Sequence, residues 1–184
     1  MKREARAITV FCGSRDGGKP VFRAAATAFG EAMAKAGFDL VYGGAANGLM
    51  GALADAVAAG GRKVIGVIPK GLDRVEFAHP KLTERIDVAS MHERKAIMAE
   101  RGDAFVALPG GFGTMDELFE ALTWRQIAIH DKPLGLLDVD GYYAPLVAWL
   151  DRAVSDGFAP PRVRDALVVD TNPASLLARL FGGA

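Results

Sequence analysis

Cysteine is almost missing from the sequence: Cys12 is its single thiol, so no disulfide can form within the chain. A lone cysteine is typical of proteins that work in a reducing compartment, and we expect a cytoplasmic protein. Neither sign of charge prevails, because 22 lysines and arginines balance 22 aspartates and glutamates. Nucleic-acid-binding and membrane-surface proteins usually carry a basic field, so this balance argues against both kinds of partner.

Long apolar runs are missing as well. No stretch approaches the roughly 20 apolar residues that cross a membrane as a helix. The run Ile8–Cys12 follows basic residues but is too short for the apolar region of a signal peptide. No repeat, linker or low-complexity tract divides the 184 residues, a length that suits one full core. We therefore expect a soluble protein in which residues 1–184 form a single nucleotide-binding, Rossmann-like domain.

What the sequence does contain is a regular alternation of short apolar runs and helical patterns. Most of the runs are apolar on both faces, as buried parallel strands are. Strands are predicted at Ala7–Cys12, Asp39–Gly44, Lys63–Pro69, Glu84–Ala89, Ala104–Pro109, Pro133–Val139 and Ala166–Asp170. Helices are predicted at Val21–Ala36, Leu49–Ala59, Met91–Arg101, Met115–Ile129, Tyr143–Ser155 and Ala174–Leu180. This order predicts the α/β class: a Rossmann-like open parallel sheet of about seven strands, with helices on both faces.

Ligands of such sheets bind at the carboxyl ends of the strands, so the strand-to-helix loops carry the candidate chemistry. The first loop, Gly13–Pro20, is close to a P-loop but has Pro20 where a Ser or Thr must hold Mg²⁺. ATPase and kinase chemistry is therefore excluded there, although Gly13 and Ser14 remain candidates to line a nucleotide site. The three histidines show no metal-ligand spacing, and no Gly-x-Ser-x-Gly motif supplies a nucleophile.

The second loop lies in Val41–Gly51, where a strand runs into glycines and then into a helix. Gly43 and Gly44 would let the backbone approach a ligand closely, and the helix would offer its free N–H groups to an anion. A tight turn without any ligand accounts for the same residues equally well.

A third segment, Ser90–Lys95, begins a helix with two cations. Ser90 and Glu93 have the spacing of a capping box, and Arg94 and Lys95 follow at once. The helix dipole disfavours cations in a first turn by roughly a few tenths of a kcal/mol. At the ligand end of the sheet, we interpret the pair as partners of a phosphate or carboxylate rather than as solvated surface.

The segment Leu108–Glu117, LPGGFGTMDE, combines a glycine-rich turn with a helix start. Its glycines would turn backbone N–H groups inward, a geometry that binds phosphate. Thr114 is the expected N-cap, and Glu117 would complete a capping box with it. The buried stripe is expected at Met115, Leu118, Phe119 and Leu122. Glu117, placed off the core, is then either a helix-start residue or, beside a phosphate, a general base or a group that stabilises a developing cation.

Together, Val41–Gly51, MHERK and PGGFGTMDE, in this order and spacing, resemble the LOG (Lonely guy) family. Its members are cytokinin riboside 5′-monophosphate phosphoribohydrolases, often mislabelled lysine decarboxylases. The resemblance covers essentially the whole chain. It implies hydrolysis of the N-glycosidic bond of a nucleoside 5′-monophosphate, with AMP as a further candidate substrate. It also implies a homodimer that needs no metal and no organic cofactor.

The resemblance also assigns roles to residues. The arginine of MHxRK and the glutamate that closes PGGxGTxxE are the family's catalytic pair, which implies Arg94 and Glu117. Contacts to the nucleotide are implied at Glu76, Lys95, Gly111, Phe112, Gly113, Thr114, Met115, Asp116 and Thr123, and less directly at Gly13, Ser14, Gly43 and Gly44. Three residues depart from the family pattern and bear on the preference for base or ribose, not on the reaction: Ala45, Phe112 and Asp116 stand for Gly, Tyr and Glu.

Two other functions use some of the same residues. A non-catalytic nucleotide sensor or carrier would need the phosphate cradle but not an acid beside it, so the pairing of Arg94 with Glu117 favours the hydrolase. A decarboxylase would need pyridoxal phosphate on a lysine, and no lysine stands out in a suitable context. The long loop Pro69–Thr83, which contains Glu76, is expected to act as a lid.

Overall fold

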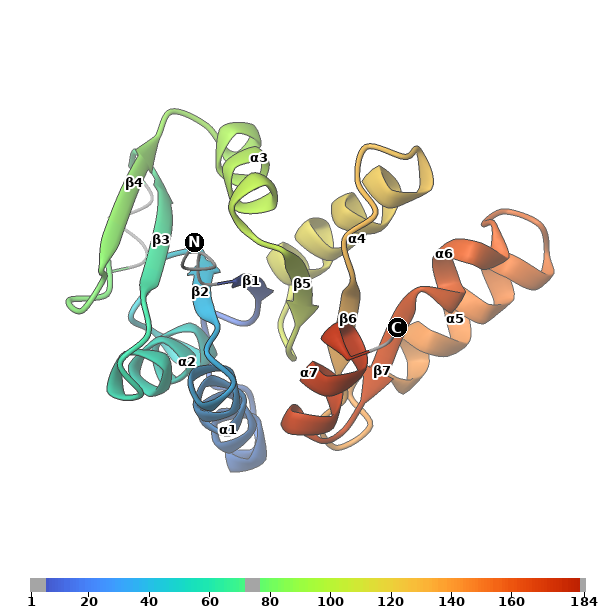
Figure 1. Ribbon diagram of the computed structural model, residues 1–184. Coiled ribbons are helices and arrows are strands. Elements are labelled where there is room, and N and C mark those ends of the chain that lie inside the picture. The colour runs from blue at the N-terminus through green and yellow to red at the C-terminus, as the bar shows by residue number, and fades with distance from the viewer. Residues whose placement is uncertain (1–5, 72–76, 183–184) are drawn as a thin grey trace.

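In the computed structural model, which describes residues 6–71 and 77–182, seven parallel strands form one sheet in the order β4-β3-β2-β1-β5-β6-β7 (Figure 1). The strands are β1 (Ala7–Phe11), β2 (Asp39–Tyr42), β3 (Val64–Pro69), β4 (Glu84–Val88), β5 (Ala104–Ala107), β6 (Leu134–Leu137) and β7 (Leu167–Asp170). The helices are α1 (Pro20–Lys35), α2 (Gly48–Ala59), α3 (Met91–Arg101), α4 (Phe112–Gln126), α5 (Ala144–Ser155), α6 (Pro161–Asp165) and α7 (Pro173–Phe181). The predicted fold class is confirmed.

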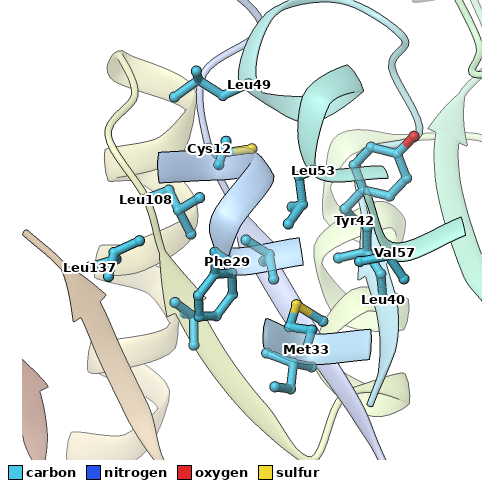
Figure 2. Packing of buried hydrophobic residues seen from close by; sticks show 14 of the residues in the cluster. Cys12, Phe29, Met33, Leu40, Tyr42, Leu49, Leu53, Val57, Leu108 and Leu137 are labelled. Carbon is cyan, nitrogen blue, oxygen red and sulfur yellow. The ribbon is translucent and has the colours of Figure 1, made fainter. Parts of the chain in front are cut away.

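Helices cover both faces of the sheet, because successive strand residues point to opposite sides. Helices α1, α2 and α7 cover one face, and α3, α4 and α6 cover the other (Figure 1). Ile8 and Val10 of β1 enter the core of the first face, whereas Phe11 enters the core of the second. Figure 2 shows the first of these cores, where Phe29 of α1 and Leu53 of α2 pack among the strands. Within the described ranges, no helix is both long and apolar enough to cross a membrane.

The strand order reverses between β1 and β5, and this reversal positions the site. From β1 the chain builds β2, β3 and β4 on one side, and α3 then carries it back to β5, from which β6 and β7 extend on the other side (Figure 1). The loops that follow β1 and β5 start side by side: Gly13 N donates to Pro109 O at 3.0 Å. They then diverge, and such a divergence leaves a crevice at the carboxyl ends of the strands.

Element bounds agree with the sequence prediction to within three residues, with two corrections. Residues Pro161–Asp165 form α6, where only a connecting segment was expected. Prolines are compatible with this helix because Pro161 stands at its first position, where a missing N–H costs nothing. Helix α4 begins at Phe112 rather than Met115. The sequence prediction missed this start because the glycines around it have low helix propensity. Thr114 is therefore not the N-cap, and it forms no capping box with Glu117.

The C-terminal helix α7 is tied to the end of β7 through one carboxylate. Asp170 accepts a hydrogen bond from Ser175 Oγ at 2.6 Å, from Asn172 N at 3.0 Å and from Arg179 Nη1 at 3.0 Å. These bonds, that from Ser175 above all, lower the pKa of Asp170 to about 2. The carboxylate thus stabilises the fold in its ionised form.

We expect Asp170→Asn to destabilise the protein at neutral pH, with an effect that fades in acid. The folded-state pKa is about 2 and the unfolded value is 3.8, so the stabilisation is complete above the unfolded value and is lost as the pH falls through the folded one. Urea unfolding of both proteins at a series of pH values checks this. A stability difference that stays constant across that acid range would show that the charge of Asp170 is not what matters.

Candidate functional site

A cavity of about 640 Å³ lies at the point where the strand order reverses. Its wall combines Cys12–Gly17 after β1, the first turn of α2, Met91 and Arg94 of α3, and the segment 109–114 with Glu117 after β5. These segments are far apart in the sequence and meet only because their strands end at the same edge of the sheet. The volume falls in the range of small-molecule sites.

The start of α4 faces this cavity with bare backbone. Its N-cap is Gly111, whose lack of a side chain leaves the first N–H groups of the helix without a capping oxygen. A Cβ atom added to Gly111 or Gly113 would meet no atom within 4 Å, whereas one added to Gly110 would lie 2.0 Å from Thr114 Oγ1. No side chain thus fits at Gly110, and the next residues offer N–H groups and the positive end of the helix dipole to an anion.

Helix α3 brings a buried arginine to the same wall. Half of the predicted capping box at its start is present: Glu93 N donates to Ser90 Oγ at 3.1 Å. The carboxylate of Glu93 accepts from Ala89 N at 2.7 Å, one residue before the N-cap, and not from Ser90 N. Arg94 follows with only 4% of its surface exposed. Its Nη1 contacts Met91 Sδ at 3.8 Å, and its Nε and Nη2 have no hydrogen-bond partner among the described residues. Buried polar groups are rarely left unpaired, so these N–H groups indicate a place for a ligand.

Glu117 also lies on the cavity wall and is only 7% exposed. It lies off the apolar core, as expected, but it is buried at the cavity and not exposed to solvent. Because α4 starts earlier than predicted, Thr114 and Glu117 stand one turn apart on the face that closes the cavity, beside the apolar stripe of Leu118 and Leu122. A glutamate and an arginine are thus both buried at one cavity.

Six further predicted residues line this cavity: Gly13, Ser14, Gly111, Phe112, Gly113 and Thr114. Six others do not reach it: Lys95, Met115, Asp116, Thr123, Gly43 and Gly44. Glu76 lies outside the described residues. The predicted nucleotide contacts thus divide into a group that the fold brings together and a group that it places elsewhere.

Two of the residues outside the cavity bind each other. Lys95 Nζ pairs with Asp116 Oδ2 at 3.1 Å and also with Glu120, so it joins α3 to α4. The hydrogen bond from Lys95 to Glu120 is the main cause of a raised pKa at Lys95. Thr123 lies farther along α4, at a separate apolar hollow near Trp149.

The loop predicted to act as a lid is fixed at one described point. His79 N donates to Gly44 O at 2.9 Å, Ala46 N donates to Phe77 O at 2.8 Å, and Ala45 and Ala78 form an antiparallel bridge. Residues 77–79 therefore pair with the loop after β2. Residues 72–76 of the expected lid lie outside the described part of the chain.

An apolar part of the wall was not expected from the sequence; it is formed by Phe22, Leu49, Met50, Met91 and Tyr142. In the sequence these residues are ordinary members of helix and loop patterns. Only the tertiary arrangement turns them toward a ligand, so no local signal could have found them.

Two adjacent tyrosines bond to backbone carbonyls at the glycine-rich turn and just before it. Tyr142 donates its hydroxyl hydrogen bond to Gly110 O, and its ring meets Phe22 edge-on at 5.8 Å between centroids. Tyr143 donates to Leu108 O at 2.6 Å, and burial raises the pKa of its hydroxyl, which keeps the proton in place. The turn is thereby supported before any ligand binds.

These features define an α/β protein of the Rossmann-like class with a cavity suited to an anionic ligand. The molybdenum cofactor binding protein of Rippkaea orientalis has a similar structure, with a TM-score of 0.74, 20% identity and coverage of 99% of this chain and 98% of that one. DNA processing protein A of Helicobacter pylori gives a TM-score of 0.60 at 15% identity, covering 97% of this chain and 81% of its own. Likenesses this distant show the fold alone.

Sequence comparison shows the family. Residues 50–180 match the family described as "Possible lysine decarboxylase". Cytokinin riboside 5′-monophosphate phosphoribohydrolase LOG3 of Arabidopsis thaliana is 48% identical over 180 residues, which cover 98% of this chain and 84% of the relative. The LOG1 enzyme of the same plant matches with the same identity and coverage. The chain belongs to the LOG family of phosphoribohydrolases.

We expect Tyr142→Phe to weaken nucleotide binding by about two- to ten-fold, because one hydrogen bond to the glycine-rich turn is lost while the ring stays. Isothermal titration with AMP measures the change. Unchanged affinity in Tyr142→Phe, together with lost affinity in Tyr142→Ala, would assign the effect to the ring instead of the hydroxyl.

Proposed function

We infer that this protein hydrolyses the N-glycosidic bond of nucleoside 5′-monophosphates, releasing the free base and ribose 5-phosphate. Its family relatives are named for this reaction on cytokinin ribosides. The observation that carries the inference is the placement of Arg94 and Glu117, both buried, on the wall of the cavity that also receives the start of α4.

The start of α4 is suited to the 5′-phosphate. Its uncapped N–H groups at Gly111–Thr114 can donate to phosphate oxygens, and the dipole adds a favourable field. No side-chain cation is needed for this contact.

Glu117 is suited to the chemistry at the sugar. Cleavage of an N-glycosidic bond develops positive charge on the ribose, as in glycoside hydrolysis. A buried carboxylate stabilises that charge, and it can take a proton from the attacking water as the oxygen bonds to the anomeric carbon. The electron pair of the broken bond leaves with the base, which is then protonated.

Arg94 supplies hydrogen-bond donors for the oxygens of this anionic substrate. Its Nε and Nη2 have no hydrogen-bond partner among the described residues, so they can donate charge-assisted bonds to phosphate or ribose oxygens. We propose that Arg94 orients the substrate against Glu117 in this way.

The apolar wall is suited to the base. Met50, Met91 and Leu49 offer polarizable and aliphatic surface, and Phe22 and Tyr142 offer ring edges. Such a wall accepts a purine with or without an apolar substituent, so we propose both cytokinin nucleotides and AMP as substrates. Phe112, which is 97% exposed, lies at the rim.

The alternatives fit less well. Pyridoxal phosphate forms a Schiff base with a lysine, and none of the described residues that line the cavity is a lysine. A sensor or carrier would use the start of α4 and the apolar wall, but it would have no use for a buried acid beside them.

Glu117→Gln tests the hydrolase directly. We expect kcat for release of adenine from AMP, followed by chromatography, to fall by about 10²–10⁴-fold, because a neutral amide neither stabilises the cation nor accepts a proton. AMP should still bind. Glu100→Gln on the exposed surface of α3 serves as the matched control and should keep full activity. A parent protein that binds AMP and cytokinin nucleotides but releases no base would favour the carrier.

We further propose that residues 1–184 act as one domain in the cytoplasm and that two copies pair. The support for pairing is an apolar face around α5, a helix with no fully buried residue. Trp149 is 56% exposed and Phe158 is 85% exposed, and between them lies a hollow of about 380 Å³ that Phe119 and Leu122 also line. An exposed apolar face of this kind is typical of an interface between subunits.

We expect Trp149→Glu to convert the dimer to a monomer, because a charge would then have to be buried against the second copy. Sedimentation velocity of the parent protein and the variant measures this. Val21→Glu, on an exposed apolar residue of α1, is the control and should leave the dimer intact. A parent protein that sediments as a monomer would contradict the pairing.

A further inference from the structure

Gly43, just after β2, lies directly behind the guanidinium of Arg94. A Cβ atom built on Gly43 would fall 1.9 Å from Arg94 Nη2 and 3.1 Å from its Cζ. Real Cβ atoms essentially never approach another heavy atom more closely than 3.0 Å. The position of the guanidinium therefore requires that residue 43 has no side chain.

The backbone of Gly43 does not itself demand glycine. Its φ lies outside the left-handed region, unlike that of the next residue, Gly44, at +82°. After the two guanidinium atoms, the atom nearest to the added Cβ is Met50 Cε at 3.4 Å, which is also the tip of a flexible side chain. By contrast, a Cβ at Gly51 would lie 2.0 Å from the backbone oxygen of Ala46. An alanine at position 43 would thus displace the guanidinium and not the fold.

Little else fixes the guanidinium of Arg94 in place. Among the described residues its hydrogen-bond partner is Met91 Sδ, a weak acceptor, at 3.8 Å from Nη1. Nε and Nη2 have no partner in the described part of the chain. Steric contact with Gly43 on one side therefore limits where Nε and Nη2, with their three N–H groups, can point.

We propose that Gly43 is a positioning residue that acts through Arg94. Gly43 makes room for Nη2 at the cavity wall. Its backbone CH₂ group carries no charge, so the positive charge of the Arg94 guanidinium stays available to an anionic substrate. Gly43 does not line the cavity, so this role replaces the expected contact with the nucleotide. The catalytic consequence rests on the proposed hydrolase function, whereas the placement of the side chain does not.

Gly43→Ala tests the proposal. We expect kcat/KM for AMP to fall by about 10- to 100-fold, because displacement of a catalytic group by about 1 Å costs up to that much. The thermal midpoint should stay close to that of the parent protein. Gly18→Ala is the matched control, since a Cβ there would meet no atom within 4 Å and Gly18 does not line the cavity.

A double-mutant comparison separates positioning from general damage. In an Arg94→Lys background, which has no Nη2 atom, we expect Gly43→Ala to cost no further activity. An equal loss in both backgrounds would overturn the proposal, as would full activity of Gly43→Ala in the parent background. If the parent protein releases no base, the hydrolase function fails, and a crystal structure of Gly43→Ala decides the placement separately: an unmoved guanidinium would refute it.

Discussion

The site depends on one constraint of topology, the reversal of strand order between β1 and β5. Because all strands are parallel, their carboxyl ends share one edge, and the loops after the two central strands separate there. The return from β4 to β5 runs through α3, which places Arg94 over this opening. The exit from β5 runs through α4, which places its uncapped start and Glu117 there. One crossing of the chain thus brings together an anion site, an acid and an arginine.

The sheet and six of the helices could be predicted well from the sequence, because βα alternation with doubly apolar strands is compatible with few folds besides an open parallel sheet. The prediction of helix bounds failed where glycine or proline residues coincide with the start of a helix. Gly111 and Gly113 have poor helix propensity, yet the helix starts among them because the turn and the packing of Leu118 require it. The short α6 was hidden by Pro160 and Pro161, which are compatible with a helix start as well as a stop.

For the site, the sequence could predict which residues take part, but not where their side chains point. Arg94 and Lys95 are neighbours in the sequence, yet one is buried at the cavity and the other bridges to Asp116 and Glu120, because successive helix residues point about 100° apart. Gly43 looked like a residue that approaches the ligand. Its contact with the guanidinium depends on a side chain from another element, which no local pattern contains.

The buried guanidinium of Arg94 also affects the stability of the protein. A buried donor left without a hydrogen bond costs about 1–3 kcal/mol, and charged donors cost more. Nε and Nη2 carry this cost in the folded chain, because no described residue accepts from them. An anion that enters the cavity removes the cost, so part of its binding free energy appears as added resistance to unfolding. The free energy of unfolding of the ligand-free protein is therefore lower than its apolar core alone would give. Binding of an anion recovers this free energy, which adds to the affinity for the anion.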